Sequence, residues 1–283
     1  MELLANPEPW KPTTSGERLL FLLAEYHQET RFLFETLRGA ELRFGRRSED
    51  LASFLIGTAV LHLQQRLIRL ADDVREMSLP DRLAEVLELR KRTCDIIQLT
   101  PLEYSGDFGE LIEEILVSAE QGNKEPTPAM KRAVMAHGPR HCYSCGRLFG
   151  AYFDDAPQGL KATVDHVWPR ALGGDTVEAN LLPACPSCNS KKGHLATWHM
   201  AWIQPVVLSD TDGLRTLPRE VKMALHMRAA TSYAQANGTT LRDAFLTIGP
   251  REPPAKVDVD QGYDFFNMRV HDEARTLVRW TPS

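Results

Sequence analysis

Four cysteines in two Cys-x-x-Cys pairs constrain this chain more than any other feature. Cys142 and Cys145 form the first pair, Cys185 and Cys188 form the second, and 39 residues separate the pairs. The thiolates of two such pairs can converge on one ion and complete the closed tetrahedral shell of a structural zinc site. The fifth cysteine, Cys94, lies in a helical stretch, where we expect a small buried hydrophobe. An odd total in this arrangement argues against a disulfide framework and predicts bound Zn²⁺.

The segment between the two pairs is typical of a β-hairpin followed by a helix. Residues 161–164 favour a strand, because β-branched side chains fit a pleated surface. A Gly-Gly turn at 173–174 reverses the chain, and residues 180–183 supply the returning strand. Pro186 suits the first turn of a helix. We therefore expect the zinc ion to hold a hairpin and a helix together.

The polar residues of this segment are those that phosphodiester hydrolysis requires. Asp165 is a hard oxygen ligand for Mg²⁺ or Mn²⁺, and the neighbouring His166 can take a proton from water near neutral pH. Asn189 offers the cation a second oxygen, and Asn180 would orient His166 through a hydrogen bond. We expect the nucleic-acid backbone to be held by basic side chains, namely Arg170, Lys191, Lys192 and His194.

The full order of these residues is Asp-His-x13-Asn-x4-Cys-x2-Cys-Asn-x-Lys-Lys, with the first cysteine pair ahead of it and Gly-Gly in the loop. This order resembles the HNH endonuclease family, the ββα-metal or His-Me finger nucleases, from Cys142 to roughly Leu195. The resemblance implies that Asp165 is a metal ligand, that His166 is the general base and that Asn180 orients it. Asn189 takes the third motif position, which is His or Asn in the family. Metal-dependent hydrolysis of DNA is the implied activity.

Two other functions compete with this interpretation. A zinc-stapled finger could bind nucleic acid without catalysis, with Asp165 capping a turn and His166 touching a phosphate. Such a module has no need of the whole Asp-His-Asn-Asn set. Alternatively, the protein is an interaction subunit whose nuclease acts only within a complex.

Charge and composition bound the partners. The net charge is −5, but residues 131–200 carry 8 Lys and Arg against 5 Asp and Glu, so the cysteine-bearing segment is basic. Local charge decides whether a phosphate backbone is attracted. No apolar run reaches the roughly 18 residues that span a bilayer. The N-terminal sequence lacks the pattern of a secretory signal. We expect a cytoplasmic protein that binds DNA and no membrane.

Hydrophobic periodicity predicts a mainly α fold with a small α+β element. Apolar residues recur at helical spacing from about residue 14 to 37, 48 to 74, 80 to 99, 108 to 119, 218 to 236 and 239 to 247. We predict an acidic helical bundle (1–128), a zinc-containing HNH domain (129–200) and a C-terminal helical extension (201–283). The bundle is expected to dock a regulatory partner or form a homo-oligomer, as in the nuclease effector of an anti-phage defence system.

Overall fold

The computed structural model describes residues 10–26, 48–97, 108–150, 161–193 and 219–251. Contacts between Cα atoms divide the chain into two compact units. The first unit consists of Met1–Pro126 and Trp168–Asn180, and the second of Thr127–Val167 and Leu181–Ser283. The chain thus leaves the second unit after Val167 and returns to it at Leu181.

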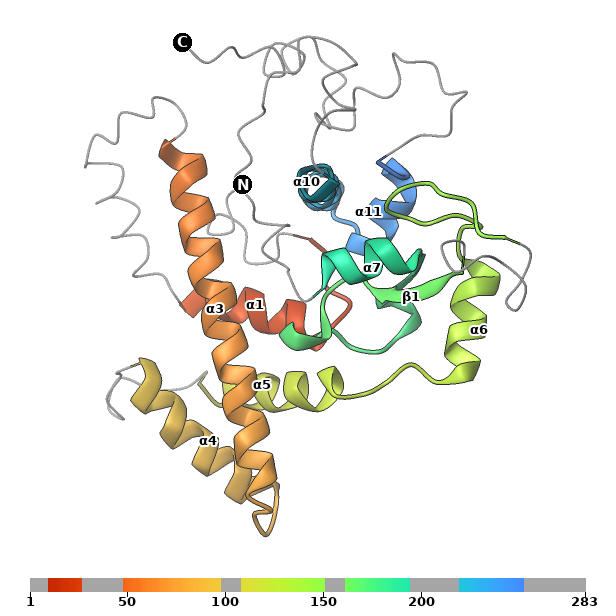
Figure 1. Cartoon of the computed structure of the whole chain (residues 1–283). Coiled ribbons are helices and arrows are strands. Elements are labelled where there is room, and N and C mark those ends of the chain that lie inside the picture. Colours follow the sequence, from red (N-terminus) through yellow and green to blue (C-terminus); the bar gives the residue numbers. More distant parts are fainter. Residues whose placement is uncertain (1–9, 27–47, 98–107, 151–160, 194–218, 252–283) are drawn as a thin grey trace. The chain divides into compact units, whose positions relative to one another are not determined.

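Four α-helices build the described part of the first unit: α1 (Ser15–Tyr26), α3 (Ser48–Glu76), α4 (Arg82–Ile97) and α5 (Phe108–Gly122). Helices α1, α3 and α5 pack against one another, and α4 packs on α3 and α5 (Figure 1). Among the described side chains, α1, α3 and α5 each bury a stripe of residues at three- and four-residue spacing, the pattern of an amphipathic helix. On α5 this stripe comprises Leu111, Ile112, Ile115, Leu116 and Ala119.

A capping box fixes the start of α1. The backbone N–H of Glu17 donates to Thr14 Oγ1 at 3.2 Å, and the N–H of Thr14 donates to Glu17 Oε2 at 2.9 Å. Two backbone donors at the helix start are thereby satisfied. Trp10, which is fully buried, donates its indole N–H to the same carboxylate at 2.8 Å. The segment before α1 is therefore anchored in the core of the first unit.

The hairpin of the second unit consists of β1 (Thr163–His166) and β2 (Leu181–Ala184), which pair antiparallel with His166 opposite Leu181. Helix α7 (Pro186–Lys192) follows β2 and packs on β1. Helix α6 (Pro128–His137) packs on both strands. Two short 3₁₀ helices, η5 (Arg170–Leu172) and η6 (Glu178–Asn180), lie in the segment between the strands, which belongs to the first unit.

Two further helices, α10 (Arg219–Asn237) and α11 (Leu241–Ile248), pack against each other in the second unit. Phe245 of α11 contacts Tyr143 edge-to-face, with ring centroids 5.1 Å apart. Arg242 of α11 donates from Nε to the carbonyl of Leu181 at 3.3 Å. Helix α11 thus contacts both the loop of the first cysteine pair and the hairpin.

The predicted fold class is confirmed: the described residues form eight α-helices and one two-stranded antiparallel sheet. The predicted hairpin and the helix at Pro186 are present. For the first helix, only the part up to Tyr26 can be compared, since residues 27–47 lie outside the described residues. Helix α6 was not predicted, although Thr127 at its N-cap and Pro128 at its first position are a start signal. Cys94 lies on α4 but is half-buried, not buried as predicted.

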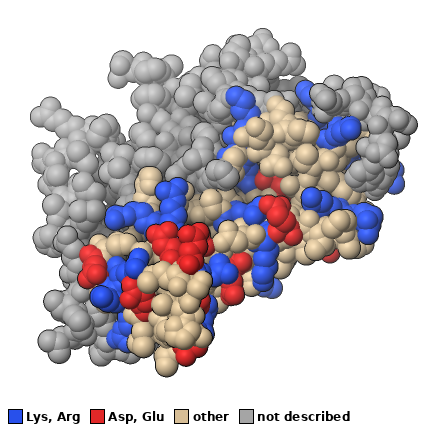
Figure 2. Space-filling view, turned by 60° about the horizontal axis from the view of Figure 1, so that its bottom comes forward, with Lys and Arg blue, Asp and Glu red and all other residues tan. Residues whose placement is uncertain are grey.

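Several charged residues of the first unit pair with one another. Arg82 contacts Glu85 at 3.3 Å and Glu113 at 3.1 Å, and Arg92 contacts Glu88 at 2.6 Å. On the face shown in Figure 2, patches of Asp and Glu lie beside patches of Lys and Arg. No helix among the described residues has the length and apolar character needed to cross a membrane.

Candidate active site

The four paired cysteines form one buried cluster. Their Sγ atoms all lie within 4.8 Å of one another. Tetrahedral Zn–S bonds of about 2.3 Å separate the sulfur atoms by about 3.8 Å, and the Sγ atoms of Cys145 and Cys185 are 3.9 Å apart. The prediction that these residues converge on one metal position is confirmed, and the size of the cluster fits Zn²⁺.

Backbone hydrogen bonds build each cysteine pair. The N–H of Gly146 donates to the carbonyl of Cys142 at 2.9 Å, and Gly146 takes the left-handed φ of 73° that such a turn requires. Cys185 is the N-cap of α7, so Cys188 falls in the first helical turn. The N–H of Tyr143 donates to the carbonyl of Pro183 at 3.0 Å, which ties the first pair to strand β2.

The metal position is also tied to the end of the described chain. Arg251, which is buried, donates from Nη2 to Cys188 Sγ at 3.5 Å and from Nη1 to Ser144 Oγ at 2.7 Å. Hydrogen bonds to Cys145 and Cys188, followed by burial, raise the pKa of the Cys142 thiol well above its ordinary value. Zinc binding therefore has to displace protons, and a guanidinium beside the cluster offsets the negative charge that results.

Asp165 does not face solvent. It is 5 % exposed, in contrast to the half-buried His166 that follows it, as expected for successive residues of a strand. Its Oδ2 accepts from the Tyr143 hydroxyl at 2.7 Å, and its Oδ1 pairs with Lys192 Nζ at 3.0 Å. Burial, and then the charge of Asp165, raise the pKa of Tyr143 well above its ordinary value, so Tyr143 remains a donor.

Lys192 is 1 % exposed and links this carboxylate to the next residue of β1. Besides its contact with Asp165, its ammonium donates to the backbone carbonyl of His166. Asn189, one turn earlier on α7, donates from Nδ2 to Thr163 Oγ1 at 3.1 Å and to the carbonyl of Val164 at 3.2 Å. One face of α7 therefore fixes the whole length of β1, including the backbone that carries His166.

Asn180 is buried and braces the chain immediately after β1. Its Oδ1 accepts from the N–H of Trp168 at 2.7 Å, and its Nδ2 donates to the carbonyl of Trp168 at 3.1 Å and to that of Asp175 at 3.0 Å. Trp168 follows His166 by two residues. Any influence of Asn180 on His166 through these bonds runs along the backbone, which differs from the direct hydrogen bond that we expected.

The four predicted nucleic-acid contacts differ in position. Lys191 is exposed on α7. Lys192 is buried, and its ammonium is committed to Asp165 and His166, so the prediction that it holds a phosphate is wrong for this structure. Arg170 donates from Nε to the carbonyl of Gly122 at 2.9 Å and pairs with Glu125. His194 lies outside the described residues.

Further basic residues of the second unit are exposed and were not singled out from the sequence. They are Lys131, Arg132, Arg140, Arg147 and Lys161. The net positive charge of residues 131–200 is the signal that could have found them. Together with Lys191 they are the described cations of this segment that a polyanion can reach.

The arrangement around Asp165 does not fit a catalytic cation. Both carboxylate oxygens already have partners, and the ammonium of Lys192 supplies the positive charge that a metal ion would bring. Asn189 binds β1 through its amide nitrogen, so only its Oδ1 could serve as a ligand, and a single amide oxygen is a sparse shell for a cation. We therefore assign no step to a cation on these two residues.

Taken together, the described residues form a β-hairpin–helix element with a buried cluster of four cysteines beside it and a histidine at the end of its first strand. Residues 142–195 match the model of a known family, HNH endonuclease. The chain therefore carries an HNH endonuclease domain in that segment, as the sequence motif predicted. No curated protein and no solved structure gives a significant match to the chain.

Proposed function

We propose that this protein is an HNH endonuclease that hydrolyses phosphodiester bonds in DNA, with His166 as the general base. The observation that carries the proposal is the position of His166. It ends β1 with a half-buried side chain, while its backbone carbonyl is bound by Lys192, and it lies within the segment that matches the family. A binding module would not require its histidine to be held at the backbone in this way.

The proposed role of His166 is to remove a proton from the water that attacks phosphorus. A general base must keep a defined position to do so, because the rate depends on the geometry of proton transfer. Three contacts supply that position: the Lys192 ammonium at its carbonyl, the Asp165–Tyr143 pair beside it, and Asn180 at Trp168. Lys191 and the exposed cations of the second unit would hold the DNA backbone.

Two metal ions are predicted, and they have different support. Zinc would be held by Cys142, Cys145, Cys185 and Cys188, where it would stabilise the fold without taking part in the reaction. A catalytic Mg²⁺ or Mn²⁺ on Asp165 and Asn189 stays a prediction from the sequence. The contacts of Asp165 with Tyr143 and Lys192 speak against this cation, so no step of the proposed reaction is assigned to it.

Purified, zinc-loaded protein incubated with plasmid DNA tests the proposal, with Mg²⁺, with Mn²⁺ and with chelator. We expect nicked or linear products with at least one cation, and a loss of about 10²- to 10⁴-fold in rate for His166→Ala. His141→Ala is the matched control, since His141 is a half-buried histidine of the same unit whose Nδ1 contacts the carbonyl of Cys142. Equal cleavage by wild type and His166→Ala would overturn the proposal and favour a contaminating activity or a binding module.

The wider biological roles rest on the sequence alone. Docking of a regulatory protein or a second copy by the acidic bundle, a part in anti-phage defence, and a cytoplasmic location are proposals of this kind. Capture of partners from native cells with the full chain tests the first of them. Cleavage that appears only after such a partner is added would favour an interaction subunit.

A further inference from the structure

The segment between the two hairpin strands, residues 168–180, belongs to the first unit and is bound there along its length. At its start, Trp168 is fully buried and lies beside Trp10, with ring centroids 6.1 Å apart. In its middle, the carbonyl of Leu172 accepts from Gln64 Nε2 at 2.9 Å. Further on, Thr176 Oγ1 donates to the carbonyl of Lys124 at 2.7 Å. This connecting segment is thus part of the helical core and not a free surface loop.

The closest approach is between backbones, at glycines. Gly16 of α1 donates its N–H to the carbonyl of Gly173 at 2.9 Å. A Cβ on Gly16 would lie 1.9 Å from the carbonyl oxygen of Leu172, roughly 1.5 Å inside ordinary contact at 3.4 Å. Gly173 has a φ of 73°, and a Cβ there would meet Ser118 of α5 at 2.6 Å. A larger residue at Gly16 would therefore prevent this approach of α1, and a larger residue at Gly173 would prevent that of α5.

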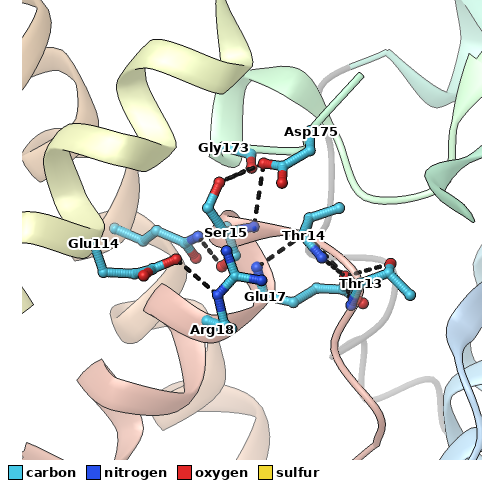
Figure 3. A network of polar contacts seen from close by, with 10 residues as sticks. Thr13, Thr14, Ser15, Glu17, Arg18, Glu114, Gly173 and Asp175 are labelled. Carbon is cyan, nitrogen blue, oxygen red and sulfur yellow. Dashed lines mark hydrogen bonds and ion pairs between the residues drawn. The ribbon is translucent and has the colours of Figure 1, made fainter. Parts of the chain in front are cut away.

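Polar contacts reinforce this packing, as Figure 3 shows. Ser15 donates from its backbone N–H to Asp175 Oδ1 at 3.2 Å and from its hydroxyl to the carbonyl of Gly173 at 3.3 Å. The carboxylate of Glu17 accepts hydrogen bonds from Thr13 and Thr14. Gln64 of α3 also donates to the carbonyl of Gly16 at 2.6 Å. Gln64 is fully buried, so it joins α1, α3 and the segment at one point.

From these contacts we infer that the first unit is a positioning part of the nuclease, with Gly16 as its critical residue. The inference rests on the proposed function. Helix α1 fixes residues 172–175, Asn180 joins Asp175 to Trp168, and Trp168 follows His166 by two residues. A displacement at Gly16 is thereby passed along the chain to the general base. Misplacement of a catalytic group by about 1 Å can cost on the order of 10²-fold in rate.

Gly16→Ala tests the inference, with Gly109→Ala as its control. Both glycines lie on helices of the first unit, but a Cβ on Gly109 meets nothing within 4 Å. For Gly16→Ala we expect faster amide hydrogen exchange in residues 168–180, changed imidazole resonances of His166, and single-turnover cleavage reduced by on the order of 10²-fold. Zinc content should stay that of wild type, because the cysteines belong to the second unit. Gly109→Ala should match wild type in every measurement.

Ser15→Ala serves as a second variant if Gly16→Ala does not fold, since it removes a hydroxyl and adds no atom. It should change exchange and the His166 resonances in the same direction, by less. The inference would be overturned if a folded variant showed faster amide hydrogen exchange in residues 168–180 but unchanged imidazole resonances of His166. It would also be overturned if Gly16→Ala and Gly109→Ala gave the same exchange, resonances and cleavage rate. Because exchange and resonances do not depend on cleavage, they decide the inference even if His166→Ala cleaves like wild type and the proposed function fails.

Discussion

Replacing Lys192 by methionine removes one partner of a buried ion pair. Lys192 and Asp165 have side chains that are 1 % and 6 % exposed, and their charged atoms lie 3.0 Å apart. Methionine keeps the length of the aliphatic chain but leaves the Asp165 carboxylate with the Tyr143 hydroxyl as its remaining described partner. The backbone carbonyl of His166 loses its ammonium donor as well.

The expected cost follows from the burial of that carboxylate. Breaking a buried pair by removing one partner costs roughly 3–5 kcal/mol, because the remaining charge cannot reach water. For a chain of this size, each kcal/mol lowers the melting temperature by about 2–4 °C, so the variant should melt roughly 6–20 °C lower. The double variant Asp165→Asn with Lys192→Met removes both charges and should cost less than the sum of the two single variants.

Denaturation should be followed on zinc-loaded protein by circular dichroism together with zinc release, which reports the unfolding of the second unit. Lys191→Met is the matched control: it removes the same charge from the neighbouring position, where the side chain is exposed. If Lys192→Met and Lys191→Met unfold at the same denaturant concentration, the pair is not what holds β1 to α7. Additive effects of Asp165→Asn and Lys192→Met would likewise contradict the coupling.

Two further predictions concern the C-terminal part of the second unit. Arg251→Met should weaken zinc binding about 10- to 100-fold, the usual effect of losing a hydrogen bond to a metal ligand. Arg147 is exposed, so Arg147→Met should leave zinc affinity unchanged. A zinc-chelator competition assay measures both affinities, and equal values for the two variants would refute a role for Arg251 at the cluster. His226 is fully buried, and burial lowers its pKa to about 4 from an ordinary 6.5. The unfolded chain therefore binds a proton more readily between these values, so stability falls as the pH drops from about 6.5 to about 4, by roughly 3 kcal/mol in all. His226→Gln should show a flatter pH profile of unfolding at constant zinc loading, and an unchanged slope would exclude His226 as its source.

The features that could be predicted from the sequence are those that depend on residues close to one another in the chain. Two Cys-x-x-Cys pairs determine a metal position by their spacing, and β-branched residues before Asp165 determine a strand, so the hairpin, the helix at Pro186 and the cysteine cluster were all predictable. Lys192 was assigned to phosphate because it sits among basic residues. It follows Asn189 by three positions, which places both on one face of α7, toward β1. The three-residue spacing of Asn189 and Lys192 is therefore a sequence signal for a buried Lys192.

No sequence motif or spacing predicts where residues 168–180 pack. Asp175 binds Ser15 across 160 positions, and Leu172 binds Gln64 across 108. Nothing in the composition of either stretch marks such a contact, because it arises from the packing of helices that are remote in sequence. The same holds for Arg251, whose contact with Cys188 spans 63 positions. The catalytic roles of Asp165, His166, Asn180 and Asn189 stay predictions.

The path of the chain between β1 and β2 has a consequence for which fragments of this protein can fold on their own. The family motif is continuous in sequence, but the molecule does not fold along that border. An excised fragment limited to residues 129–200 would carry Trp168 and Leu172 into water without the helices that cover them. The borders of the HNH motif therefore differ from the borders of the compact units, and a fragment that contains the motif with its buried residues covered must include helices of the first unit.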